Sequence, residues 1–191
     1  LRSKNNVSSG DGNHIHATPD TTALWFKTAT TVGVTEQHLV SWEGDGTCPS
    51  CDYYKISLEG NTGKIVFEFN TDQNTGDTST CKSTSRYDDS QWYHVVAVRQ
   101  GVAGNWNATI YVNGVFNGSA TTATEPNSAP KLTIGRYGSS SSYYFNGTID
   151  EVMIFNRSLT SSEIVGLYNA TRVSHSSVSL ADGSHTLNAY T

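Results

Sequence analysis

The stretch that decides the fold is Asn146-Gly147-Thr148-Ile149-Asp150-Glu151-Val152-Met153-Ile154-Phe155-Asn156-Arg157. It opens with Asn-Gly, a dipeptide that favours a turn because both residues tolerate positive φ. Apolar side chains then recur at Ile149, Val152, Ile154 and Phe155. This pattern predicts a strand with at least one buried face near the end of the chain.

A short helix is predicted directly after that strand. Thr160 and Glu163 have the spacing of a capping box, in which each side chain bonds the backbone amide of the other at a helix start. Ile164, Leu167 and Tyr168 follow at i, i+3 and i+4, which places them on one helical face. The sequence therefore predicts a long strand that leads into a helix over 160–169.

A second pair of segments predicts a hairpin. Residues 91–98 read Gln-Trp-Tyr-His-Val-Val-Ala-Val, and residues 108–114 read Ala-Thr-Ile-Tyr-Val-Asn-Gly. Together with the closing strand and helix, they resemble the laminin G-like domains of the concanavalin-like lectin superfamily, over residues 7–170. Those domains end in a Gly-x-Ile-Asp-Glu-Val strand and a short helix. Their central hairpin pairs a Trp-x-His strand with one that ends in Tyr-Val-Asn/Asp-Gly.

The resemblance implies an all-β fold, a two-sheet antiparallel jelly roll with one short helix. It specifies no function, because this fold hosts lectins, adhesion modules, enzymes and structural domains. We expect a Thr/Ala-rich loop over 119–130, and further strands at 22–28, 38–43, 53–59, 64–70, 78–84 and 131–136. We assign residues 1–172 to the jelly roll. Residues 173–191 form a C-terminal strand extension that pairs either with its own sheet or with a neighbouring subunit.

The composition favours an extracellular protein. Charged residues make up 15% of the 191, below the usual quarter, so Ser, Thr, Asn and Gly must cover the surface. The net charge of −5 argues against a nucleic-acid partner. No apolar run approaches the length of a membrane span. The chain begins at Leu1 without a visible signal peptide, so we expect a processed product.

The three cysteines favour a structural disulfide. Cys48 and Cys51 form a Cys-x-x-Cys, but the βαβ context of a redox motif and the second ligand pair of a zinc site are both missing. If the strands form a meander, the loops before residue 53 and after residue 70 lie at the same end of a sheet. Cys48 and Cys51 lie in the first loop, and Cys81 lies near the start of the strand that follows the second. We therefore expect Cys81 to bond with Cys48 or Cys51.

Catalysis is not expected. Glu43-Gly44-Asp45 begins like the Glu-x-Asp-x-x-Glu strand of some glycosidases on this fold, but Cys48 occupies the third position. The two-carboxylate mechanism then lacks its acid partner. Asp150 and Glu151 are adjacent, so on a regular strand they would point to opposite faces.

The resemblance also implies a structural calcium ion, because many related domains hold one near an early Gly/Asp turn and the closing strand. Asp11 and Asp150 match those two positions, and hard cations take carboxylate and carbonyl oxygens. The alternative is that Asp150 caps backbone amides and Asp11 forms a solvated turn. For a sugar site, stacking requires exposed aromatic rings. The candidates in or beside loops are Trp106, Tyr137, Tyr143 and Tyr144, unless they pack over the sandwich edge; we assign no ligand-binding residues.

Six Asn-x-Ser/Thr sequons are candidate glycosylation sites in a secreted protein. They begin at Asn6, Asn107, Asn117, Asn146, Asn156 and Asn169. Asn117 is the strongest candidate because it is expected beside a turn.

Two functions remain open from the sequence. The first is a non-catalytic structural or adhesive surface protein that self-assembles into an oligomer or filament. It rests on residues 173–191, which cannot fold alone as an isolated hairpin and could pair with a neighbour's sheet edge. The alternative is a carbohydrate-binding, lectin-like module, with or without a dependence on calcium.

Overall fold

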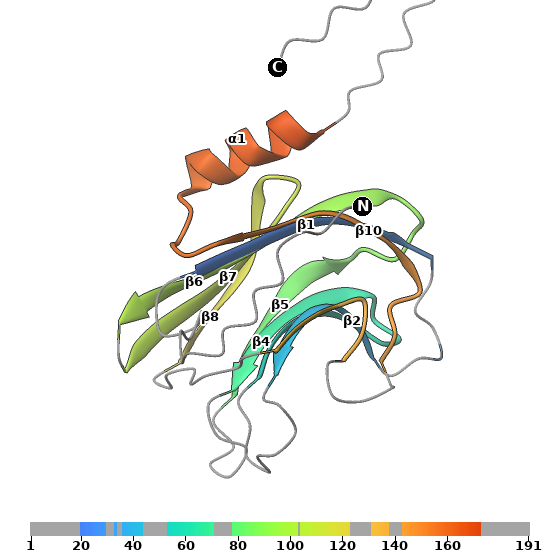
Figure 1. Ribbon diagram of the computed structural model, residues 1–191, viewed down its shortest axis with the longest axis horizontal. Helices are drawn as coiled ribbons and strands as arrows, with labels where there is room; N and C mark the ends of the chain where they lie inside the picture. Colours follow the sequence, from blue (N-terminus) through green and yellow to red (C-terminus); the bar gives the residue numbers. More distant parts are fainter. Residues whose placement is uncertain are drawn as a thin grey trace, which may run out of the picture.

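A computed structural model of the protein describes residues 20–29, 33, 36–43, 53–70, 78–102, 104–122, 131–137 and 143–172. Two five-stranded antiparallel sheets and one helix, α1 (Ser161–Thr171), make up this part of the chain. Figure 1 shows three layers: α1 lies on the sheet that contains residues 20–28, called sheet A, and sheet A lies on the other sheet, called sheet B. The predicted two-sheet antiparallel fold with one short helix is confirmed.

Sheet A has the strand order β10-β1-β6-β7-β8. Its strands are β10 (Gly147–Phe155), β1 (Asp20–Thr28), β6 (Trp92–Val102), β7 (Asn105–Val112) and β8 (Val115–Thr122). Sheet B has the order β5-β4-β3-β2-β9. Its strands are β5 (Thr78–Arg86), β4 (Lys64–Asn70), β3 (Tyr53–Glu59), β2 (Glu36–Glu43) and β9 (Lys131–Ile134).

The main core lies between the two sheets, where alternate side chains of every long strand point inward. Leu24 and Phe26 of β1 face Ile56 of β3 and Phe67 of β4 in one buried cluster. A charged pair is also buried there. Arg99 Nη2 lies 2.8 Å from Asp20 Oδ2, which satisfies two charges that would otherwise be costly to remove from water.

Helix α1 covers the outer face of sheet A. Ile164 packs against Ala23, Val96 and Val98, which point away from the main core. The predicted capping box is present: Glu163 N donates to Thr160 Oγ1 at 3.3 Å, and Thr160 N donates to Glu163 Oε2 at 2.8 Å. Among the described residues, no helix is long and apolar enough to cross a membrane.

Two local predictions were wrong. Residues 119–122 belong to strand β8 rather than to a loop. Asn113 and Gly114 both have positive φ, 51° and 79°. Positive φ at two consecutive residues is typical of the two-residue turn that joins the strands of a hairpin, and β8 accordingly pairs with β7 after this turn. The strand was not predicted because the Ser- and Thr-rich sequence of β8 does not show apolar residues at every second position.

The second error concerns Asp150 and Glu151, which do not point to opposite faces. Ala23 of β1 pairs with Met153 of β10, and Trp25 pairs with Asp150. Glu151 and Val152 of β10 therefore both lie opposite Leu24. This is a β-bulge, and Glu151 adopts φ 50° within it. Both carboxylates line one pocket as a result.

Candidate functional site

The strands of sheet B arch, and the hollow of the arch faces away from sheet A (Figure 1). We call this outer surface the concave face. Side chains alternate along a strand, so outward positions of the sheet B strands point to it; on β2 the alternation is interrupted by a register shift between His38 and Val40. The concave face includes Glu36, His38, Tyr53, Lys55, Ser57, Glu68 and Thr80, with Tyr143 at one end.

Lys55 is the centre of a charge ladder across three strands. Its Nζ lies 3.0 Å from Glu36 Oε1 on β2 and 3.4 Å from Glu68 Oε1 on β4. Each of the three side chains is mostly buried but keeps some exposed surface. The ladder therefore presents two carboxylates and one ammonium group in fixed positions.

Hydroxyl groups hold the two carboxylates in place. Ser57 Oγ donates to Glu36 Oε1 at 2.6 Å, and Thr80 Oγ1 donates to Glu68 Oε2 at 3.2 Å. The Tyr53 hydroxyl also donates to Glu68. Neutral hydroxyls that donate to ionised acceptors make strong, directional bonds, so the orientation of both carboxylates is set before any ligand arrives.

The pKa of Glu36 reflects this environment. Burial acts to raise the pKa, but hydrogen bonds from His38 and Ser57 and the charge of Lys55 outweigh burial and lower it to about 2. Glu36 is therefore ionised across the physiological range. It can accept hydrogen bonds from a ligand but cannot donate one.

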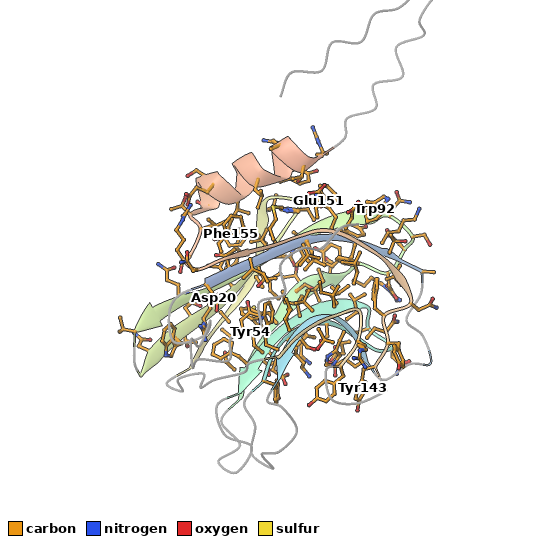
Figure 2. All side chains as sticks on the ribbon, viewed as in Figure 1. Asp20, Tyr54, Trp92, Tyr143, Glu151 and Phe155 are labelled. Atoms are coloured by element: carbon orange, nitrogen blue, oxygen red, sulfur yellow. The ribbon has the colours of Figure 1, made fainter. Side chains whose placement is uncertain are left out.

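An aromatic corner lies beside Glu36. The ring of Tyr143 stacks on His38 at 5.4 Å, and Tyr137 meets both rings edge-on at 5.1 and 5.8 Å. His38 is buried, and its backbone N–H donates to the Tyr143 carbonyl at 3.0 Å. Tyr143 remains 40% exposed, and Figure 2 shows it on the side of sheet B away from α1. This corner offers an apolar ring next to the charge ladder.

The four aromatic candidates from the sequence divide accordingly. Tyr137 and Tyr143 form the aromatic corner, and Tyr144 is exposed beside it. Trp106, the fourth candidate, lies in the main core and not at the surface. β7 begins at Asn105, so Trp106 takes an inward position, 3% exposed, with the Arg99 guanidinium 5.1 Å from its ring.

The calcium prediction remains untested. Asp150 is exposed on β10, where its Oδ1 accepts from the Glu151 amide at 2.9 Å, and Asp11 lies outside the described residues. In the described part of the chain, no group of three or more His, Cys, Asp or Glu could hold a metal ion. The observed bond matches the amide-capping alternative for Asp150.

Cys81 lies in the main core with a free thiol, and burial raises its pKa to about 11. Such a thiol is poorly reactive, because the thiolate is the reactive form. Because the Cys81 thiol is free, the predicted disulfide between Cys81 and Cys48 or Cys51 is not present in the structure; Cys48 and Cys51 themselves lie outside the described residues.

The sequons also stay predictions. Asn146, Asn156 and Asn169 are exposed, Asn107 is partly buried, and Asn6 lies outside the described residues. Asn117 lies within β8, the strand that begins directly after the turn at Asn113-Gly114. Its Nδ2 donates to the Tyr87 hydroxyl at 2.7 Å, so a glycan on this nitrogen would compete with a native contact.

Sequence reasoning missed the charge ladder. Lys55 and Glu68 lie at outward positions of strands that bury only one face. A polar residue at such a position is ordinarily solvent-exposed and does not by itself indicate a site. The period-two pattern of Ile65, Phe67 and Phe69 shows that Glu68 points outward, but the pairing of Lys55 with Glu68 depends on strand register. Register could not be read from the sequence.

A family model described as the concanavalin A-like lectin/glucanases superfamily, of the laminin G type, matches residues 1–165, so the chain belongs to this superfamily. The resemblance inferred from the sequence is confirmed. No curated protein matches the chain.

Solved structures give the same fold. The CBM40 domain of the Ruminococcus gnavus IT-sialidase, a carbohydrate-binding module, matches with a TM-score of 0.67 at 12% identity, over 81% of this chain and 84% of that one. A structure of that domain bound to alpha2,3 sialyllactose gives 0.67 at 13% identity, over 81% and 84%. Domain 4 of AbnA, a GH43 extracellular arabinanase from Geobacillus stearothermophilus, in complex with arabinotriose, gives 0.61 at 19%, over 83% and 69%. At these identities the likeness is one of fold, and the jelly roll is confirmed.

Proposed function

We propose that this protein is a non-catalytic, extracellular carbohydrate-binding module and that its ligand lies on the concave face. The observation that carries the proposal is the fixed charge ladder beside the exposed ring of Tyr143. A sugar ring presents apolar C–H groups on its faces and hydroxyls at its edge. Tyr143 offers a surface for the first, and Glu36, Lys55 and Glu68 offer partners for the second.

The charges of the ladder favour an uncharged glycan. The ammonium group of Lys55 is shared by two carboxylates, so the ladder carries a net negative charge. An acidic sugar would meet repulsion from Glu36 and Glu68. The sialyllactose bound by the CBM40 relative is therefore not the ligand class we expect here.

The fold of the relatives supports this function over self-assembly. The structures that share the fold include a carbohydrate-binding module and a domain in complex with arabinotriose. The self-assembly hypothesis rests on residues 173–191, which lie outside the described residues. The structural calcium predicted at Asp11 and Asp150 is a separate question, because Asp150 does not lie on the concave face; a chelator added to the binding assay tests whether binding depends on calcium.

The test is a glycan array that carries neutral and sialylated oligosaccharides, followed by isothermal titration calorimetry with the best neutral binder. We expect Tyr143→Ala and Glu36→Gln each to weaken binding at least about tenfold, the loss of about 1.4 kcal/mol that one ring contact or charged hydrogen bond supplies. Tyr144→Ala is the matched control, because Tyr144 is also exposed but contributes no ring to the corner. Thermal unfolding of each variant checks that the fold is intact.

Three results would count against the proposal: binding of acidic glycans alone, no glycan binding at all, or folded Tyr143 and Glu36 variants that bind like the parent protein.

A further inference from the structure

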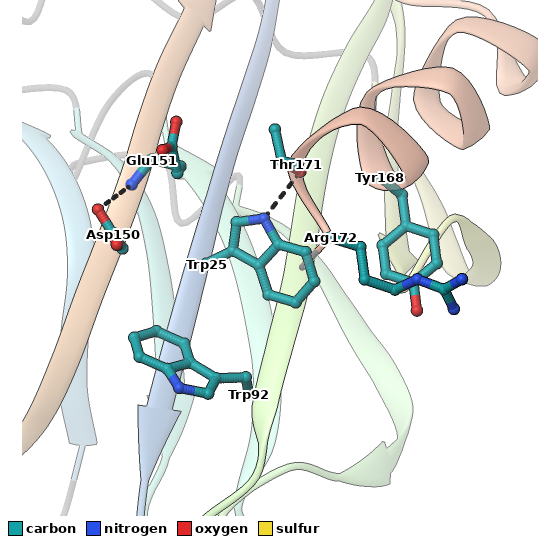
Figure 3. A pocket seen from close by; sticks show the side chains of 7 residues that line it. All are labelled: Trp25, Trp92, Asp150, Glu151, Tyr168, Thr171 and Arg172. Atoms are coloured by element: carbon teal, nitrogen blue, oxygen red, sulfur yellow. Dashed lines mark hydrogen bonds between the residues drawn. The ribbon is translucent and has the colours of Figure 1, made fainter. Parts of the chain in front are cut away.

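A pocket of about 540 Å³ lies on the other side of the molecule from the concave face, between the outer face of sheet A and the C-terminal end of α1. Figure 3 shows it, and Figure 2 shows that Trp92 and Glu151 lie toward α1 while Tyr143 lies beyond sheet B. The pocket is lined by Trp25, Trp92, Asp150, Glu151, Tyr168, Thr171 and Arg172. It shares no residue with the concave face.

Two indole rings make its walls. Trp25 and Trp92 come from the adjacent strands β1 and β6. Trp25 is held firmly, because its Nε1 donates to Thr171 Oγ1 at 2.9 Å and its ring stacks on Tyr168 at 5.7 Å. Trp92 is 42% exposed, a large aromatic surface left open to solvent. The pocket therefore offers one fixed ring and one accessible ring.

Two carboxylates lie on the β10 side of Trp25. The bulge turns Glu151 to φ 50°, a conformation that a non-glycine residue adopts at a cost, and brings it to the same pocket as Asp150. The Glu151 amide donates to Asp150 Oδ1 at 2.9 Å, which orients the Asp150 carboxylate. In the part of the chain that the structure describes, neither carboxylate forms an ion pair with a basic side chain.

Two basic side chains lie near these carboxylates: Arg172, and Lys27, which pairs with Trp92 in the register of β1 and β6; neither forms an ion pair with either carboxylate in the described part of the chain. Arg172 lines the pocket, but its guanidinium carbon lies 5.4 Å from the centre of the Tyr168 ring, on the helix side in Figure 3. His94 packs under Trp25 and Tyr168, and burial lowers its pKa to about 4, so it is neutral at physiological pH. The pocket thus combines aromatic faces with two carboxylates that form no ion pair with a described basic side chain.

We propose that this pocket is a second binding site and that it takes an amino sugar with a free, protonated amine. A cation is attracted both to carboxylates and to indole faces, and a pyranose ring packs flat against an exposed tryptophan. A neutral sugar would leave the charge of Asp150 and Glu151 unmatched, and an acidic one would be repelled. The amine is therefore the feature that the site selects.

The experiment compares two glycans that differ in the amine. Calorimetry or NMR titration of the full chain uses glucosamine tetrasaccharide and its fully N-acetylated counterpart. We expect the free amine to bind at least about tenfold more tightly, because acetylation removes the charge. Trp92→Ala, Asp150→Asn and Glu151→Gln should each weaken binding several-fold. Asp89→Asn, which removes an exposed carboxylate outside the pocket, should not.

The proposal is overturned if both glycans bind equally, if neither binds, or if the three pocket variants bind like the parent protein. It is also overturned if Tyr143→Ala abolishes amine binding while Trp92→Ala does not, since the amine would then lie on the concave face. Because the two sites share no residue, an experiment that refutes one proposal does not refute the other.

Discussion

Removal of the Arg99 guanidinium should be among the most destabilising single changes in this protein. Arg99 is 0% exposed and Asp20 is 2% exposed, so their 2.8 Å contact is a fully buried ion pair. In Arg99→Met the long apolar side chain can still lie against Trp106 and Phe69, whose rings are 5.1 and 5.9 Å from the guanidinium. The packing is largely kept, and the main loss is the charge that compensates Asp20.

Breaking a buried pair in this way costs about 3–5 kcal/mol, because the remaining charge stays out of water. For a domain of this size each kcal/mol lowers the melting temperature by roughly 2–4 °C, so we expect a decrease of roughly 6–20 °C. Tyr54 cannot take over from Arg99. Its hydroxyl donates to Asp20 at 3.3 Å, and burial, together with the Asp20 charge, raises its pKa well above the usual value, so it supplies a hydrogen bond but no charge.

The assay is urea denaturation of the parent, Arg99→Met, Asp20→Asn and the double variant. If uncompensated charge is the cause, the double variant should be more stable than Arg99→Met alone, and the two changes should be strongly non-additive. A loss below about 1 kcal/mol in Arg99→Met, or costs that simply add in the double variant, would refute the reasoning.

Three further predictions concern stability and reactivity. Because its folded pKa is lowered to about 2, Glu36 contributes stability that is present above its unfolded pKa and lost as the pH falls toward 2; Glu36→Gln should flatten the acid-unfolding curve in that window. Gly118→Ala should destabilise the protein by about 1–3 kcal/mol, because the new Cβ would lie 2.5 Å from the Lys82 carbonyl oxygen. Gly166→Ala, whose Cβ would meet no atom within 4 Å, should stabilise α1 by about 0.5–1 kcal/mol. The midpoint of denaturant unfolding measures both effects. Cys81 should resist iodoacetamide in the native protein and react on unfolding in reductant; rapid native labelling would contradict its burial.

The sequence predicted the elements whose signals are local. The closing strand, the capping box at Thr160 and the Trp-x-His hairpin each depend on residues that are neighbours along the chain, and each is present. β8 was missed because its pairing is set by the turn at Asn113-Gly114 and not by an apolar pattern of its own. Trp106 could not be assigned to the surface or the core because a shift of one residue at the start of a strand moves a side chain from one to the other.

The candidate sites were harder to predict than the fold, because both depend on residues that are distant in the sequence. Lys55 meets Glu36 and Glu68 only through the register of three strands. Asp150 and Glu151 reach one pocket only because a bulge interrupts the alternation of β10. A bulge inserts one extra residue in a strand, and the alternating sequence pattern gives no sign of it.

The two sites differ in how their charge is balanced, and this should separate them in solution. On the concave face, Lys55 already lies between two carboxylates, and the expected ligand is neutral, so added salt has little charge attraction to screen. In the pocket, Asp150 and Glu151 are exposed and the expected ligand is a cation, so their attraction falls as the ionic strength rises. We therefore expect neutral-glycan binding to change little between low and physiological salt, while amino-sugar binding weakens. If the affinity for the amino sugar does not change with salt concentration but is still lost in Trp92→Ala, the indole rings and not the carboxylates select the ligand.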